Sequence, residues 1–179
     1  MKNKNQKMHV VTVDMGYGHQ RAAYPLASVS TGGVINANQY KGISKKEERS
    51  WQEGRRWYEV ISRFKKVPIL GAVAFAMMDN FQKIEPFYPR RDLSKTSSQQ
   101  RYFYKKVKKG LGKDLITTLN KKPIPLVTTF FVPAYFAEYC NYEGQIYCVV
   151  CDADVARAWA PHDARHSKVI YLAPNKRVK

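Results

Sequence analysis

The sequence predicts an α/β fold, in which a mostly parallel sheet of about five strands carries helices on both faces. Short apolar runs rich in Val and Ile alternate along the chain with segments of helical periodicity, and strands separated by helices favour parallel pairing. The 179 residues, 44% of them hydrophobic, suffice for one domain with a buried core. We therefore expect a single Rossmann-like domain over residues 1–179.

The first elements are predicted to form a βαβ unit. Residues 8–14 have the pattern of a buried strand, residues 18–28 that of a helix, and residues 33–37 that of a second short strand. Parallel sheets bind their ligands beyond the carboxyl ends of the strands. The turn from Asp14 to His19 follows the first strand at such an end.

The middle of the chain predicts helices. Ser44 and Glu47 have the spacing of a capping box, and the apolar residues after them fall near one helical face up to about Lys66. A proline can open another helix over residues 68–83. The irregular, Pro-rich and aromatic stretch over residues 85–91 then predicts a loop.

The second half of the chain supplies the remaining strands. Ser97 and Gln100 again have capping-box spacing, which predicts a basic, aromatic-rich helix that breaks near Gly110 and Gly112. A helix opened by Pro133 separates the first two of three further strands. These strands are predicted over residues 124–130, 145–150 and 168–172.

The composition indicates an anionic partner. The 31 Lys and Arg outnumber the 14 Asp and Glu, and the formal net charge of +17 attracts nucleic acid, anionic lipid or phosphorylated substrates without choosing among them. Three cysteines are an odd count, which fits a reducing cytoplasm better than a disulfide framework, and no metal cluster is indicated. The basic N-terminus lacks the apolar core of a signal peptide, and the longest apolar window, residues 67–78, is shorter than the roughly 20 residues that span a bilayer.

The turn that opens the first helix is the leading candidate site. Gly16 and Gly18 leave backbone N–H groups accessible at the positive end of the helix dipole, where a phosphate or another anion binds. Tyr17 and Arg21 belong to the same predicted site, and His19 can hydrogen-bond a phosphate or act as a base. Arg21 occupies the third glycine position of Gly-x-Gly-x-x-Gly, and no acidic residue follows the second strand, so a dinucleotide site is disfavoured. In the alternative interpretation, His19 caps the helix and binds no ligand.

A second candidate site follows the strand over residues 145–150. Asp152 and Asp154 lie at its carboxyl end, where a carboxylate can act as a base, hold a sugar hydroxyl or bind a cation. Alternatively, one of them caps the next short helix and pairs with Arg157. For Asp154 this structural role is the better prediction.

Two basic segments are candidate contact surfaces. Cations next to apolar residues are typical of an element that lies on an anionic membrane, and the predicted membrane-surface residues are Lys65, Lys66, Ile69, Leu70 and Phe75. A buried core helix with a basic turn before it explains the same pattern. The basic aromatic helix over residues 101–109 has the composition of a nucleic-acid contact, although such a run is more often a solvated face.

Both ends of the chain resemble the N-terminal half of GT-B glycosyltransferases, in particular the group of monogalactosyldiacylglycerol synthases and lipid-linked muramyl-peptide N-acetylglucosaminyltransferases. The glycine-rich turn with His19 and the Ala22-Ala23 pair after it match the loop that follows the first strand in that group. A later strand of the group ends in Thr-Asp with a Trp downstream, and here Cys151-Asp152 and Trp159 occupy these positions. The segment over residues 125–133 resembles the preceding strand and its loop. Residues 40–120 have no counterpart that we can align.

The resemblance implies a cytoplasmic, peripheral membrane protein whose domain binds the acceptor. A sugar nucleotide would be the donor substrate, with no other cofactor, and a hexosyl group would pass to a lipid or polyprenyl-linked acceptor. His19 would contact an acceptor phosphate or deprotonate the acceptor hydroxyl, with Asp152 as the competing base. The family's second domain, which holds the donor, has no counterpart here, so the chain would be part of a longer enzyme, act with a separate donor subunit, or have lost catalysis. We expect this chain alone to be inactive. The alternative is a non-enzymatic module that binds anions or nucleic acid.

Overall fold

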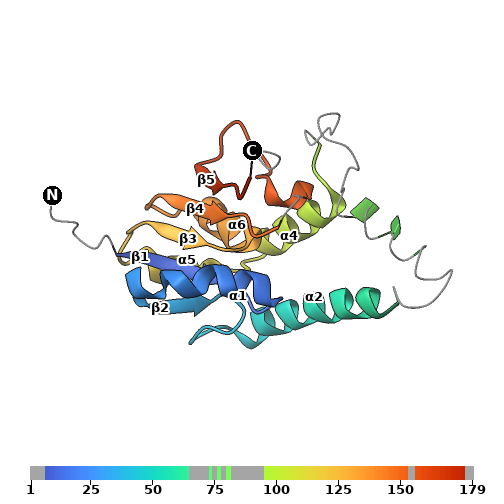
Figure 1. The fold of residues 1–179 in the computed structure, drawn as a ribbon, viewed down its shortest axis with the longest axis horizontal. Helices are drawn as coiled ribbons and strands as arrows, with labels where there is room; N and C mark the ends of the chain where they lie inside the picture. Colours follow the sequence, from blue (N-terminus) through green and yellow to red (C-terminus); the bar gives the residue numbers. More distant parts are fainter. Residues whose placement is uncertain are drawn as a thin grey trace.

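Five parallel strands form one sheet at the centre of the molecule (Figure 1). The computed structural model describes residues 7–64, 73, 76–77, 80–81, 95–152 and 156–175. The strands are β1 (Met8–Thr12), β2 (Ser30–Asn36), β3 (Leu126–Thr128), β4 (Ile146–Val149) and β5 (Val169–Leu172), and their order is β2-β1-β3-β4-β5. All five predicted strands are present, and every pairing is parallel. The predicted Rossmann-like α/β fold is confirmed.

Helices connect the strands and cover the sheet. The helices described are α1 (Tyr17–Ala23), α2 (Lys45–Phe64), α4 (Ser98–Lys108), α5 (Lys113–Leu119) and α6 (Phe131–Tyr139), with the 3₁₀ helices η1 (Tyr24–Val29) and η2 (Arg157–Trp159). The chain moves from β1 to β2 in one direction and from β3 to β5 in the other. Because parallel crossovers are right-handed, α1 and α6 lie on opposite faces of the sheet.

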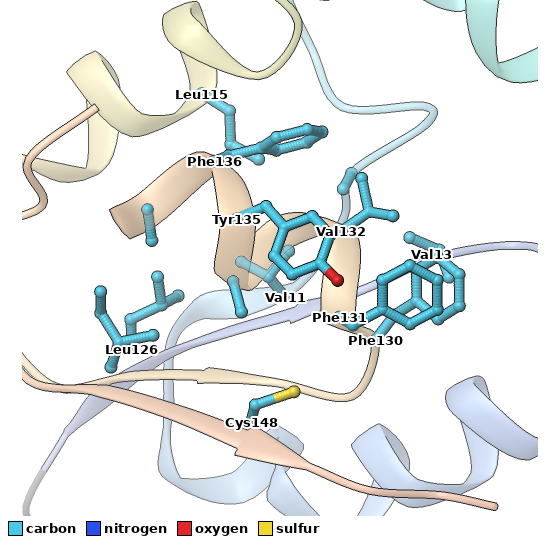
Figure 2. Close-up of a cluster of buried hydrophobic side chains, with 14 of the residues drawn as sticks. Val11, Val13, Leu115, Leu126, Phe130, Phe131, Val132, Tyr135, Phe136 and Cys148 are labelled. Atoms are coloured by element: carbon cyan, nitrogen blue, oxygen red, sulfur yellow. The ribbon is translucent and has the colours of Figure 1, made fainter. Parts of the chain in front are cut away.

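The main core lies on the α6 face. Side chains alternate along a strand, so Val11 of β1 joins the core of α6, whereas Val10 is buried outside that core on the α1 face. Seven consecutive residues of α6, 131–137, are buried, as expected for a helix that is apolar on all sides. Figure 2 shows Tyr135 and Phe136 of this helix above the strands. The Tyr135 hydroxyl donates a hydrogen bond to a backbone carbonyl of η2, which satisfies the one polar group of this buried side chain.

The helix boundaries differ in part from the prediction. The helix expected over residues 18–28 ends at Ala23 and continues as η1, because Pro25 has no backbone N–H for a continuing α-helix. Helix α5 was not predicted. The predicted helix over residues 68–83 and the loop over residues 85–91 lie largely or wholly outside the described residues.

Both predicted capping serines bind the helix that follows them. Ser97 Oγ accepts a hydrogen bond of 3.1 Å from the Gln100 amide, and Ser44 Oγ accepts one of 3.2 Å from the Glu47 amide. The Glu47 carboxylate accepts hydrogen bonds from the Gly112 amide at 3.0 Å and the Tyr40 hydroxyl at 3.3 Å. Glu47 thereby connects the first turn of α2 to the start of α5.

Glu47 is expected to make stability depend on pH. Burial raises the pKa of its carboxyl above the ordinary 4.5, although the hydrogen bond from Gly112 offsets part of the rise. The folded state therefore holds this proton more tightly, so the stabilisation is complete below pH 4.5 and is lost as the pH rises through the folded pKa. In urea unfolding across this pH range, the unfolding free energy of wild type should fall as the pH rises, and that of Glu47→Gln should fall less. Glu48→Gln, which alters an exposed contact with Gln52, should show the same fall in unfolding free energy as wild type. An equal slope in wild type and Glu47→Gln would contradict the assignment.

Candidate functional site

The candidate site lies where three neighbouring strands end. The sheet order reverses direction between β1 and β3, and in open α/β sheets ligands bind beside such a point, beyond the carboxyl ends of the strands. His19 follows β1, Thr129 follows β3 and Asp152 follows β4. Strand register therefore brings together residues that are far apart in the sequence.

His19 is held as a neutral base. Its Nδ1 lies 2.8 Å from the carbonyl oxygen of Thr129, and because a carbonyl only accepts, the proton of the neutral ring is on Nδ1. Nε2 then carries the lone pair. Burial lowers the pKa of His19 below the ordinary 6.5, while the Thr129 hydrogen bond and the Asp152 charge act in the opposite direction. The imidazole is thus neutral, with a fixed tautomer, at neutral pH.

Aromatic rings fix the orientation of this base. The His19 ring makes an edge contact with Phe130 at a centroid distance of 4.7 Å and lies 6.2 Å from the ring of Trp159. Trp159 Nε1 donates a hydrogen bond of 2.8 Å to Asp152 Oδ2. The indole therefore positions the carboxylate whose charge acts on His19.

His19 and Asp152 open onto a cavity of about 560 Å³. Seven aromatic side chains from separate segments of the chain form much of its wall: Trp51, Phe81, Tyr102, Phe103, Phe130, Phe131 and Trp159. Besides His19 and Asp152, the polar residues on the wall include Ser50, Gln99 and Lys106. Ligand sites commonly combine such an apolar wall with a few convergent polar groups. The cavity is suited to a ligand with an apolar body and a reactive polar group.

The other predicted site residues lie elsewhere. Gly16, Tyr17, Gly18 and Arg21 are exposed at the start of α1 and do not line this cavity, and the side chain of Tyr17 is 81% exposed. Their role in anion binding stays a prediction. The predicted membrane-surface residues Lys65, Lys66, Ile69, Leu70 and Phe75, as well as Asp154, lie outside the described residues.

No known protein family, curated protein or solved structure matches this chain.

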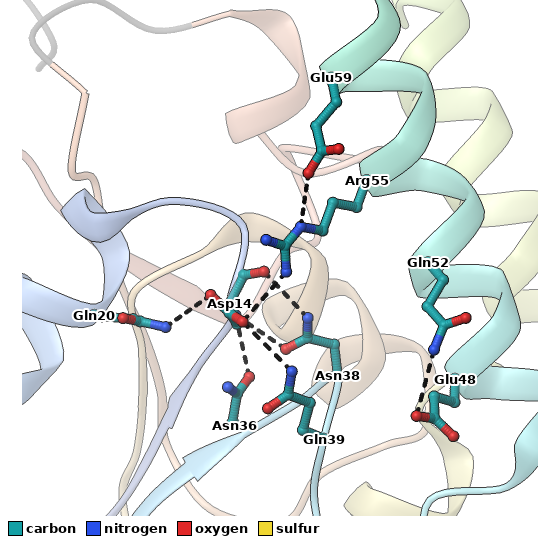
Figure 3. A network of polar contacts seen from close by, with 9 residues as sticks. All are labelled: Asp14, Gln20, Asn36, Asn38, Gln39, Glu48, Gln52, Arg55 and Glu59. Atoms are coloured by element: carbon teal, nitrogen blue, oxygen red, sulfur yellow. Dashed lines mark hydrogen bonds and ion pairs between the residues drawn. The ribbon is translucent and has the colours of Figure 1, made fainter.

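A polar network holds the turn before His19. Asp14 Oδ1 accepts from Gln20 at 3.0 Å, and Asp14 Oδ2 lies 3.4 Å from both Gln39 Nε2 and Arg55 (Figure 3). The Asp14 amide in turn donates to side-chain oxygens of Asn36 and Asn38, at the end of β2. Asp14 thus ties the β1 end to α1, the β2 end and α2.

The two cysteines near the site lack the lowered pKa that marks a reactive thiol. Cys148 and Cys151 have Cys-x-x-Cys spacing and are free. Burial raises the pKa of both, to about 11 for Cys151, whereas reactive thiols have a lowered pKa. The Cys151 thiol donates to the Thr129 carbonyl at 3.3 Å, the same oxygen that holds His19. Cys151 therefore supports the geometry of the base.

The described part of the chain has neither a candidate metal site nor a helix that could span a membrane. There, no group of three or more His, Cys, Asp or Glu side chains is arranged to hold a metal ion. Within the same residues, no helix has both the length and the apolar content to cross a bilayer.

Several site residues were missed by the sequence analysis. Thr129 acts through its backbone carbonyl, which leaves no mark in a sequence. The aromatic wall gave no signal because its members look like ordinary core residues in the sequence. Trp159 was noticed only as a match to the glycosyltransferase pattern, and Lys106 only as part of a basic helix. The spacing of Asp152 and Trp159 after a strand end was the one sequence signal that could have indicated their contact.

Proposed function

We propose that this chain is the acceptor-binding domain of an inverting GT-B-like glycosyltransferase. The observation that carries the proposal is the neutral His19, whose Nδ1 is fixed by the Thr129 carbonyl beside Asp152 at the mouth of an aromatic cavity. A neutral imidazole with a free lone pair on Nε2 suits deprotonation of a hydroxyl during transfer. The resemblance of the two strand-end motifs supports the same function.

In the proposed reaction, the apolar part of an acceptor lies in the cavity and its hydroxyl lies at His19. The hydroxyl oxygen forms a bond to the anomeric carbon of the sugar, the bond from that carbon to the nucleotide diphosphate breaks, and the proton passes to His19 Nε2. Asp152 stabilises the imidazolium that results, since its charge favours the protonated ring. A separate donor domain or subunit holds the sugar nucleotide. The acceptor is a lipid or polyprenyl-linked molecule at the cytoplasmic membrane surface.

The test is glycosyl transfer from a panel of sugar nucleotides to membrane lipid extract. We would compare this chain alone with the chain joined to any sequence that follows it in its gene. Transfer that requires the joined form supports an acceptor domain. No transfer in either form, with every donor tested, counts against the proposal.

A second candidate function is binding of nucleic acid through α4. Arg101, Lys105, Lys108 and Lys109 are exposed on or at the end of this helix, and Tyr102 between them is 39% exposed. Binding through four phosphate contacts should give a slope of about −3 in a plot of log affinity against log salt concentration. Binding of lipid extract through apolar contacts should leave a salt-resistant remainder. Salt titration with RNA and with lipid vesicles separates the two functions.

A further inference from the structure

Helix α4 carries one lysine that differs from its neighbours. Lys105, Lys108 and Lys109 are exposed, whereas the side chain of Lys106 is only 20% exposed and lines the aromatic cavity. Successive residues of an α-helix point about 100° apart, so neighbouring lysines can face solvent and cavity respectively. Lys106 is therefore the member of this basic helix that a ligand in the cavity would meet.

The Lys106 ammonium is held in place from two sides. Nζ donates to Ser50 Oγ at 2.6 Å and lies 4.7 Å from the centre of the Tyr102 ring. It also lies 3.4 Å from the Ser50 carbonyl oxygen. The nearest carboxylate, Glu53, is 3.8 Å away with a side chain that is 67% exposed, so water screens this ion pair. The ammonium is positioned but only weakly neutralised.

Filling the cavity with an apolar body would remove water from Lys106. A cation that loses its water without gaining a partner is costly, and an anionic group on the ligand offsets that cost through a charge-assisted hydrogen bond. The carboxylate of Asp152 disfavours an anion at its own part of the wall. The charges thus favour one orientation, with the anion at Lys106 and the opposite polar group near His19.

We propose that Lys106 is the specificity residue of this cavity, and that the cavity takes an amphiphile whose phosphate binds Lys106 Nζ while its apolar body packs against the aromatic wall. The inference rests on the proposed function only in making this amphiphile the acceptor. It assigns anion recognition to α4, whereas the sequence pattern pointed to Arg21, which is exposed and outside the cavity.

The test is isothermal titration calorimetry with three probes: decyl phosphate, decanol and inorganic phosphate. Wild type should bind decyl phosphate about tenfold more tightly than decanol, in line with one charge-assisted hydrogen bond. Lys106→Met should abolish this preference, whereas Lys105→Met, an equal charge change on the exposed side, should keep it. Lys106→Arg should restore most of the preference. Glu53→Gln should increase it, because the competing carboxylate is gone.

Three results would overturn the inference. They are an equal preference in Lys106→Met and Lys105→Met, absence of binding of both decyl probes, and binding of inorganic phosphate as tight as that of decyl phosphate. The last result would mean that the site takes free phosphate and not an amphiphile. These measurements involve no sugar transfer, so failure of the proposed function leaves a Lys106-dependent phosphate preference intact, and loss of that preference leaves the transfer test unaffected.

Discussion

Replacing Gly112 by alanine is expected to lower the free energy of unfolding by about 3 kcal/mol or more. Gly112 precedes α5 with φ of 80°, a left-handed conformation that a side chain disfavours. An added Cβ would also lie 2.1 Å from Cγ of Phe136, far inside van der Waals contact. Backbone strain and overpacking therefore act together at this position.

Neither partner can move away easily. Phe136 of α6 is completely buried in the main hydrophobic core, where Leu115 also lies (Figure 2). The Gly112 backbone is fixed by the hydrogen bond that its amide donates to Glu47. Relief of the clash would require a shift of α5 or loss of this bond.

Gly110→Ala is the matched control for this substitution. Its φ of 99° is also left-handed, but an added Cβ there has no atom within 4 Å. Urea unfolding should therefore show a loss of about 1 kcal/mol for Gly110→Ala, from backbone strain alone. Equal losses in the two variants would show that Phe136 gives way and that overpacking contributes nothing.

The local patterns of the sequence predicted the elements better than their arrangement. Alternation of apolar runs with capped helices located all five strands, because burial and capping are local requirements. The strand order depends on which strands pair across long separations, so it could not be derived from these patterns. Helix α5 was missed because Gly110 and Gly112 indicate a break, and the pattern does not show that Gly112 also opens a new helix.

The candidate site divides in the same way. His19 and Asp152 were predicted because each follows a strand, and the carboxyl ends of parallel strands meet at one edge of the sheet. The cavity wall and the place of Lys106 in it were not predicted, because α2 and α4 meet only through tertiary packing. Ser50 and Lys106 are separated by 56 positions, and nothing in either segment indicates their contact.

The largest effect on activity is expected at His19. In the proposed sugar transfer, His19→Ala should lower the rate by about 10² to 10⁴-fold, the usual contribution of a general base. Binding of decyl phosphate at Lys106 should change much less, which separates a chemical role from loss of the folded site. The interpretation of His19 as a helix cap is wrong, because Gly16 precedes α1 with no side-chain capping bond and His19 instead bonds the Thr129 carbonyl. Unaltered transfer by His19→Ala would remove His19 from the mechanism and leave it this structural contact alone.

The dependence of transfer on pH tests the environment of the same base. Because burial lowers the pKa of His19, the acid limb of the rate profile should lie below pH 6.5, with the rate rising as the ring loses its proton. Asp152→Asn removes a charge that raises this pKa, so the limb should move to still lower pH while the amide oxygen continues to accept from Trp159. Asp163→Asn is the control, since that carboxylate raises the pKa of His166 at an exposed site. NMR titration of the His19 ring should follow the kinetic limb in each variant. A limb above pH 6.5, or one that Asp152→Asn does not move, would mean that another group takes the proton.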